Sequence, residues 1–169
     1  MDRRFADFDH DESGSIYEYA ARSALALYKD FVKGAPSATL AVISEHSLPP
    51  QAVSAIKASA ERLGYGRDSC FWVAMRGDSR EGSGDVASVK LGDQDLRTLL
   101  ESVDPLSLIV TDAFCAHALE NAYGEPCQVN SVASVNGRPA VFLGDFPLML
   151  QDEEGKQRAW HLMKALRLD

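Results

Sequence analysis

Short apolar runs alternate with amphipathic helical segments along most of this chain, and this alternation restricts its fold more than any other feature. The apolar runs, at 38–45, 70–75, 106–111 and 140–144, contain β-branched residues and resemble buried strands. Segments with helical spacing follow Ser15 and lie at 50–63, 93–103, 113–122 and 153–167. The pattern predicts an α/β domain with a central, largely parallel sheet of about four strands.

The composition is that of one domain, and we expect residues 15–169 to form it behind an acidic N-terminal arm at 1–14. The chain has 169 residues, 46% of them hydrophobic, which is enough for a single core. No apolar run is long enough to cross a membrane, and the start M-D-R-R-F-A-D-F-D-H-D lacks the apolar region of a signal peptide. These features predict a cytoplasmic protein that does not interact with membranes.

The three cysteines, Cys70, Cys115 and Cys127, are an odd number without C-x-x-C spacing. This pattern argues against a disulfide framework, a zinc site or an iron–sulfur cluster. Near a helix start, Cys115 could have a lowered pKa, although a small core residue is the favoured interpretation. We therefore expect reduced thiols, no metal and no cofactor.

The net charge of −8 is concentrated at the N-terminus. Residues 1–20 hold six acids against Arg3 and Arg4, which is half of the excess. Phosphate contacts need clustered Lys and Arg, so this balance argues against nucleic-acid binding driven by net charge. A local basic patch remains compatible with it.

The stretch D-H-D-E-S-G-S-I-Y-E-Y-A, residues 9–20, resembles a calcium-binding loop, but Ala20 stands where the loop needs a bidentate carboxylate. Ser15-x-x-Glu18 is a capping box, which predicts a helix start instead. We expect no calcium binding. The helix should continue to Gly34. Residues that recur at helical spacing along it are Ile16, Tyr19, Ala20, Ser23, Ala24, Leu27, Tyr28 and Phe31.

Two loop segments also carry predictions. Residues 76–92 are rich in Gly, Ser and charge, which predicts a mobile loop. The pair Asn136-Gly137 between two apolar runs predicts a β-hairpin turn.

The segment V-F-L-G-D-F-P-L-M-L-Q-D-E-E-G-K-Q-R-A-W-H-L-M-K-A-L resembles the C-terminal signature of the uracil-DNA glycosylase superfamily. That signature is a strand, a His-Pro-Ser loop, apolar residues, a polar turn and a K-x-x-x-W-x-x-L helix. Here Pro147, 148–150, Lys156 and Trp160 fall at comparable spacing. Weaker similarity in the same order extends over about 38–167. The resemblance implies a three-layer α/β/α fold.

The family's catalytic positions are mostly replaced in this chain. Ser44 stands where the first loop has Gly, Val73 lies where the second strand ends in a base-reading Asn, and Phe146 replaces the His that stabilises the departing uracil anion. Glu45 corresponds to the water-orienting Glu of the iron–sulfur branch, whose cluster cysteines are absent. Phenylalanine cannot stabilise an anion by hydrogen bonding or charge, so the resemblance implies a fold without uracil excision.

The candidate site is a remnant of the family's pocket. Its residues are Ser44, Glu45, His46, Val73, Asp145, Phe146 and Pro147. Glu45 and His46 could act as a base and its neighbour, but adjacent side chains that leave a strand usually point apart. Asp145 could face the pocket or cap a turn. Trp72 and Trp160 could stack bases, although strand and helix spacing favours the core.

Three functions follow from the sequence. The leading hypothesis is a non-catalytic member of the superfamily that binds a protein partner in DNA replication or repair, as the psi subunit of bacterial DNA polymerase III does with this fold. The first alternative is a divergent glycosylase or hydrolase that uses Glu45. The second is a small-molecule or nucleotide binder that uses the remnant pocket.

Overall fold

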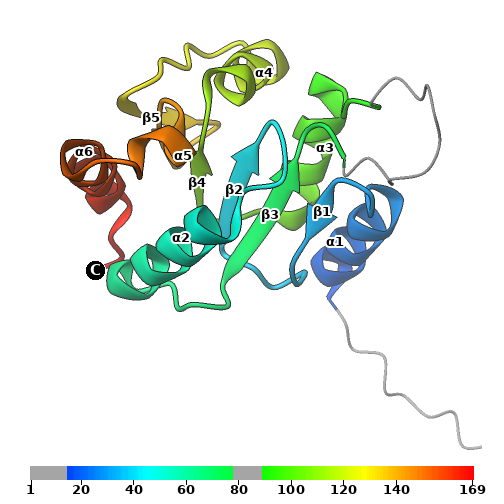
Figure 1. Ribbon diagram of the computed structural model, residues 1–169. Coiled ribbons are helices and arrows are strands. Elements are labelled where there is room, and N and C mark those ends of the chain that lie inside the picture. Colours follow the sequence, from blue (N-terminus) through cyan, green and yellow to red (C-terminus); the bar gives the residue numbers. More distant parts are fainter. Residues whose placement is uncertain (1–14, 78–88) are drawn as a thin grey trace, which may run out of the picture.

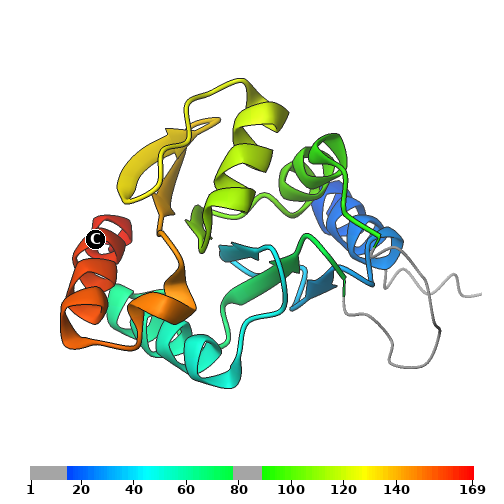
Figure 2. The ribbon, with the colours of Figure 1, turned by 45° about the horizontal axis from the view of Figure 1, so that its top comes forward.

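A computed structural model describes residues 15–77 and 89–169, and its centre is a six-stranded sheet (Figures 1 and 2). The strands are β1 (Val32–Lys33), β2 (Leu40–Ser44), β3 (Cys70–Ala74), β4 (Ser107–Val110), β5 (Ser131–Val135) and β6 (Arg138–Phe142). Their order is β1-β3-β2-β4-β6-β5. The four inner strands are parallel, and the two edge strands pair antiparallel to their neighbours.

Helices cover both faces of the sheet. They are α1 (Ile16–Leu27), α2 (Pro50–Leu63), α3 (Asp93–Val103), α4 (Ala113–Tyr123), α5 (Phe146–Met149) and α6 (Glu153–Met163), followed by the 3₁₀ turn η1 (Lys164–Leu166). One core lies between the sheet and α1, α3 and α4, and the other between the sheet and α2, α5 and α6. The predicted three-layer α/β/α fold with a largely parallel sheet is confirmed, with two more strands than expected.

The alternating directions of strand side chains explain the two cores. Along β2, Ala41 and Ile43 belong to the α1–α3–α4 core, whereas Leu40 and Val42 belong to the α2–α5–α6 core. All five residues of β2 and all four of β4 are buried. Burying one Leu or Ile side chain contributes about 1.5–3 kcal/mol, so the central strands are the main source of stability.

Helix ends follow the sequence signals closely in most places. Gly64 and Gly124 end α2 and α4 with φ of 96° and 69°, as expected for left-handed C-caps. Asn136 and Gly137 have φ of 49° and 81°, and they form the predicted hairpin turn between β5 and β6.

The start of α3 has two acidic residues, Asp93 and Asp95, but neither of them caps it. The N-cap residue is Gly92, and it makes no side-chain cap hydrogen bond. Both carboxylates contact other side chains instead. Asp93 forms an ion pair with Lys90 at 3.7 Å, and Asp95 accepts a 3.0 Å hydrogen bond from the Tyr28 hydroxyl. The Tyr28 contact ties the C-terminal end of α1 to α3.

The first helix starts as predicted but ends earlier and buries only part of the predicted face. The Ser15 hydroxyl accepts a 3.3 Å hydrogen bond from the Glu18 amide, which confirms the cap. The helix stops at Leu27, and Val32–Lys33 instead forms the edge strand β1. The predicted buried face is only partly right. Ala24 is buried together with Ala21, and Leu25 and Tyr28 are partly buried against the core. Ile16, Tyr19 and Leu27 are exposed instead.

Some predictions fall on residues that the structure does not describe. The acidic arm and the first positions of the calcium-like loop (Asp9, Asp11, Ser13 and Gly14) lie outside the described residues, as does most of the loop predicted at 76–92. At the ends of that loop, Arg76 and Lys90 form an antiparallel bridge, and Leu91 is buried. Among the described helices, none is both long and apolar enough to cross a bilayer.

Candidate functional site

The centre of the sheet contains a topological switch point. From β2 the chain crosses to β3 on one side, and from β4 it crosses to β6 on the other. Parallel sheets commonly bind ligands outside the carboxyl ends of the strands at such a point. Glu45 follows β2 and Asp112 follows β4, so the sequence prediction placed Glu45 at the expected edge of the sheet.

Hydrogen bonds within the protein occupy the polar groups at this switch point. The Asp112 carboxylate accepts a 2.9 Å bond from the Glu45 amide and a 3.3 Å bond from the Thr111 hydroxyl through Oδ2. Its Oδ1 accepts a 2.8 Å bond from the Cys115 amide and caps α4. The buried Ser44 hydroxyl donates to the Val73 carbonyl at 3.3 Å. Asp112 therefore holds β2, β4 and α4 together.

The Glu45 side chain forms an ion pair with the strand next to its own. Its Oε1 lies 2.9 Å from Arg76 Nε, and the exposed His46 ring approaches the same oxygen at 3.8 Å. Arg76 also lies over the Phe114 ring, 5.0 Å from its centroid, and Lys90 lies over this ring at 4.9 Å. These contacts link the segments that follow β2, β3 and β4.

The described residues at this edge of the sheet favour neither a cysteine nucleophile nor a metal site. Cys115 is fully buried, and burial raises the pKa of its thiol, with a further increase from the Asp112 carboxylate. The favoured core interpretation of Cys115 agrees with this environment. Among the described residues, no group of three His, Cys, Asp or Glu side chains could hold a metal ion.

The predicted pocket residues do not all line one cavity. Ser44 and Val73 both border the hollow over β3 that is described below, although Val73 also belongs to the α1–α3–α4 core. Glu45 and His46 follow β2 at the switch point. Phe146 is fully buried between α2 and α6, and its amide donates a 3.1 Å bond to the Thr111 carbonyl. Asp145 caps α5 by accepting the Leu148 amide, and Pro147 lies in the first turn of this helix.

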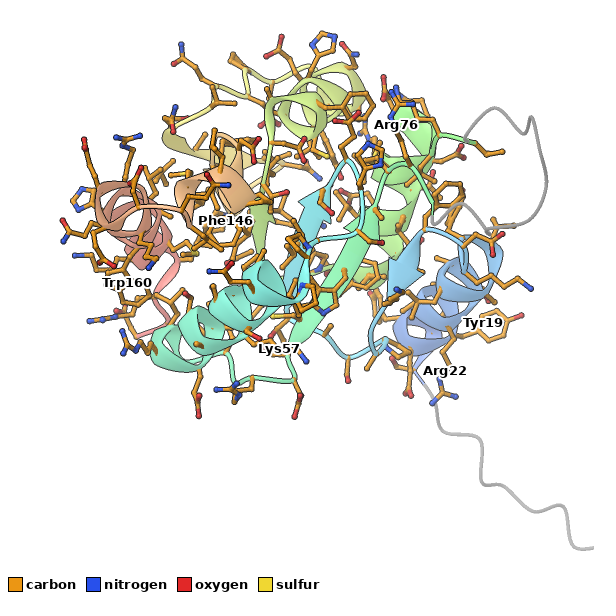
Figure 3. The ribbon with its side chains drawn as sticks, viewed as in Figure 1. Tyr19, Arg22, Lys57, Arg76, Phe146 and Trp160 are labelled. Carbon is orange, nitrogen blue, oxygen red and sulfur yellow. The ribbon has the colours of Figure 1, made fainter. Side chains whose placement is uncertain are left out.

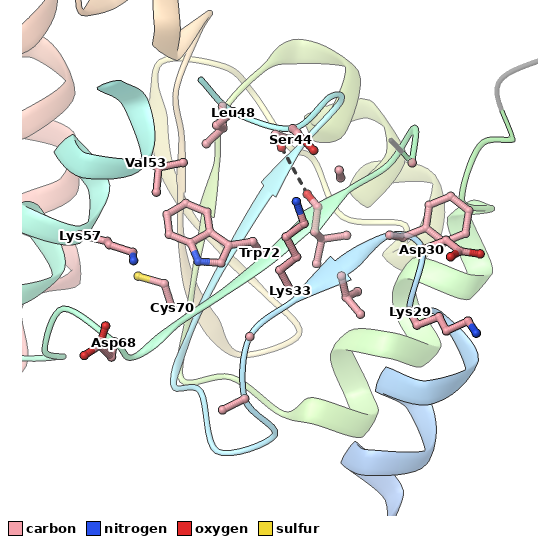
Figure 4. Close-up of a pocket in the computed structure, with 18 of the residues that line it drawn as sticks. Lys29, Asp30, Lys33, Ser44, Leu48, Val53, Lys57, Asp68, Cys70 and Trp72 are labelled. Carbon is pink, nitrogen blue, oxygen red and sulfur yellow. Dashed lines mark hydrogen bonds between the residues drawn. The ribbon is translucent and has the colours of Figure 1, made fainter. Parts of the chain in front are cut away.

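A large hollow lies beside the switch point, over β3 and β1 (Figure 4). Its volume is ≈ 1110 Å³, and it follows the length of β3 from Arg67 and Asp68 to Gly77. We call it the Trp72 groove. Along the α2 side of the sheet, Trp72 pairs in register with Val42 on β2 and with Lys33 on β1. Within the described chain α2 packs over β2. Toward the edge of the sheet, the half-buried Trp72 side chain forms the floor of the groove.

Apolar and basic side chains both line the Trp72 groove. The apolar ones are Leu48, Val53, Cys70 and Trp72; the charged ones are Lys29, Lys33, Lys57 and Arg67 with Asp30 and Asp68. The formal charge of this set is +2, four bases less two acids, although the whole chain carries −8. In Figure 4 Lys57 reaches from α2 toward Cys70, and Lys33 extends beside Trp72. A local basic patch therefore exists on an acidic protein.

The Cys70 thiol belongs to the apolar part of this groove. Burial raises its pKa to about 11, and the nearby Lys57 offsets only part of this effect. A protonated, buried thiol does not act as a nucleophile at neutral pH. The groove thus combines a flat ring and an apolar floor with lysines at its border.

Sequence reasoning did not identify this groove. The alternation in C-F-W-V-A-M does place Cys70 and Trp72 on one face of a strand. This face is accessible because β3 lies next to the edge strand of the sheet. Local sequence patterns do not predict the position of a strand within a sheet.

Comparisons with known proteins do not supply a family. No protein-family model matches the chain, and a search of curated proteins found no significant match. The resemblance to uracil-DNA glycosylases therefore rests on the sequence segments alone.

Proposed function

We propose that this protein is a non-catalytic binding protein with a uracil-DNA glycosylase-like fold, and that its ligand occupies the Trp72 groove. The observation that carries the proposal is a half-buried indole inside a groove bordered by four basic side chains. The internal bonds of Asp112 and the Glu45–Arg76 ion pair support binding rather than catalysis, because they engage the polar groups at the switch point.

The chemistry of the groove favours a nucleotide, either free or within a short single strand. A base can stack on the Trp72 indole, which typically contributes about 1–3 kcal/mol. Lys57, on the α2 wall, is placed to attract a phosphate that follows this base. A nucleotide-binding role is compatible with the proposed link to DNA replication or repair.

The dimensions of the groove favour more than one nucleotide. Its ≈ 1110 Å³ is at the upper end of the roughly 300–1,000 Å³ usual for small-molecule pockets. Arg67 and Lys29 both line it, and in Figure 4 Lys29 and Asp68, the residue after Arg67, lie at opposite ends. A short single strand would place successive phosphates near both ends.

Tryptophan fluorescence provides a direct test. In a Trp160→Phe background Trp72 is the remaining tryptophan, and we expect adenosine monophosphate and a short single-stranded DNA to quench it. Adenosine, which lacks the phosphate, should bind more weakly, and binding of the DNA should weaken as salt increases.

Two charge variants distinguish binding in the Trp72 groove from general electrostatic attraction of the ligand to the protein. Lys57→Glu should weaken binding by about tenfold or more, since it replaces a favourable charge beside the stacked base with a repulsive one. Lys156→Glu, on α6 and outside the lining of the Trp72 groove, should leave binding unchanged. Absence of quenching at millimolar ligand, or equal effects of the two variants, would contradict the proposal.

A further inference from the structure

The outward face of α1 carries large apolar side chains at helical spacing. Ile16, Tyr19 and Leu27 are 78%, 74% and 73% exposed, and the small residues Ala20 and Ser23 between them are exposed as well. In Figure 3 the Tyr19 side chain extends away from the body of the protein. The helix thus presents its larger side chains outward, while its packed side consists mainly of alanine.

Such a face is unfavourable in water. Each large apolar side chain gains about 1.5–3 kcal/mol when it moves from water to a buried position. Contiguous apolar patches on folded proteins mark sites of protein–protein contact. On this helix, the charged pair Glu18 and Arg22 lies on one flank of the apolar face, and their side chains form a 2.6 Å ion pair.

We propose that this face binds the same face of a second copy of the chain, with the two α1 helices antiparallel. The face is self-complementary about its centre, which lies between Ala20 and Ser23. When Ala20 lies opposite the partner's Ser23, Ile16 lies opposite the partner's Leu27. Large side chains therefore meet at both ends, and small ones at the centre allow the helix axes to approach to about 8 Å.

Charge complementarity supports a second copy in this orientation. In an antiparallel pair related by a two-fold axis, each flank meets the same flank of the partner helix. Glu18 then lies within about one helical turn of the partner's Arg22, and the reverse contact forms by symmetry. A parallel two-fold pair would instead bring this flank against the opposite flank of the partner helix, so these Glu18–Arg22 contacts would not form.

The size of the contact determines its strength. A helix of 12 residues is roughly 18 Å long, so two such helices bury less than the ~1,600 Å² of a standard interface. We therefore expect a reversible dimer with a dissociation constant on the order of 10–100 µM.

Sedimentation velocity over a concentration series tests the dimer. The wild-type protein should change from monomer to dimer between about 5 and 500 µM, the range that brackets the expected constant. Leu27→Glu should weaken the association at least tenfold. Leu148→Glu, at a 58% exposed apolar residue on α5, is the matched control and should behave as wild type. Wild-type protein that stays monomeric throughout, or Leu27→Glu protein that dimerises normally, would overturn the proposal.

Cysteine cross-linking tests the orientation. The three native cysteines are buried, so a cysteine introduced on α1 would be the accessible thiol. An equimolar mixture of Ile16→Cys and Leu27→Cys proteins should form mixed disulfides faster than either variant forms disulfides with itself. Faster self-linking of the single variants would exclude the antiparallel arrangement.

Discussion

The backbone amide of Glu45 donates a 2.9 Å hydrogen bond to the carboxylate of Asp112, and this bond joins the carboxyl ends of β2 and β4. The same carboxylate caps α4 through the Cys115 amide. The place where a parallel sheet commonly binds ligands is thus held together by a side chain of the protein itself. The Trp72 groove, one strand further out, is the more accessible region.

Removal of the Asp112 carboxylate should destabilise the fold. We expect Asp112→Ala to lower the free energy of unfolding by about 2–3 kcal/mol, because it removes a helix cap and leaves the Glu45 amide without its acceptor. Asp112→Asn keeps one acceptor oxygen and should cost about half as much. Urea denaturation measures both effects, and an unchanged midpoint in Asp112→Ala would show that the bonds contribute little.

We expect no excision of uracil from single- or double-stranded DNA. Loss of one anion-stabilising donor typically slows such chemistry about 100- to 1,000-fold. By the resemblance to the glycosylases, Phe146 stands at the position of that donor, and its side chain is buried in the core. The measurement is prolonged incubation of excess protein with a labelled uracil-containing strand, followed by alkaline cleavage. Strand scission that is lost in Glu45→Gln would favour the divergent enzyme instead.

Stability should decrease in acid because of Glu101. Hydrogen bonds from Arg138 lower the pKa of this carboxyl to about 2, against the opposing effect of burial, and bonds from Tyr123 and Asn136 add to the decrease. Because the folded pKa is below the ordinary value of 4.5, the stabilisation is present above about pH 4.5 and is lost as the pH falls toward 2.

The partial exposure of Glu101, whose side chain is 39% accessible, reduces this effect to about 1–2 kcal/mol. Denaturant melts between pH 6 and about pH 2.5 should show a smaller acid loss in Glu101→Gln than in the wild type. Glu153→Gln, at an exposed site on α6, is the control and should keep the wild-type slope. Parallel curves for wild type and Glu101→Gln would contradict the prediction.

The Ser15 cap should contribute modestly to α1. We expect Ser15→Ala to cost about 0.5–1 kcal/mol, in the lower part of the usual range because the Ser15–Glu18 bond is long at 3.3 Å and exposed. Ser23→Ala, an exposed change within the same helix, should be neutral or slightly stabilising, since alanine is the better helix former. Thermal melts at low protein concentration compare the two, and equal effects would refute the cap.

Local patterns predicted most of the elements but not how they pack. Hydrophobic runs and capping signals located β2, β3, β4 and β6, the start of α1, and the helices α2, α3, α4 and α6, because these signals act within a few residues. The α1 face was predicted only in part, because periodicity identifies the larger apolar face, whereas the fully buried residues of α1 are the small Ala21 and Ala24. The edge strand β1 has two residues, too few for any periodic signal.

The candidate site was predictable only in part. Glu45 and His46 were placed correctly after a central strand, because the carboxyl ends of parallel strands lie along one edge. Prediction of the groove would have required the order of the strands in the sheet. This order brings Lys33 beside Trp72, although the two residues are 39 positions apart in the sequence. The spacing of residues in the sequence does not indicate that Lys33 and Trp72 lie side by side.

The buried cysteines give this protein three built-in reporters of local opening. Burial raises the pKa of each thiol, to about 11 for Cys70 and Cys127, so a thiol-specific reagent reacts mainly when a segment opens. Cys115 would report opening of α4, Cys127 that of the loop before β5, and Cys70 that of the groove floor. A ligand in the Trp72 groove should slow the labelling of Cys70 and leave the labelling rates of the other two thiols unchanged.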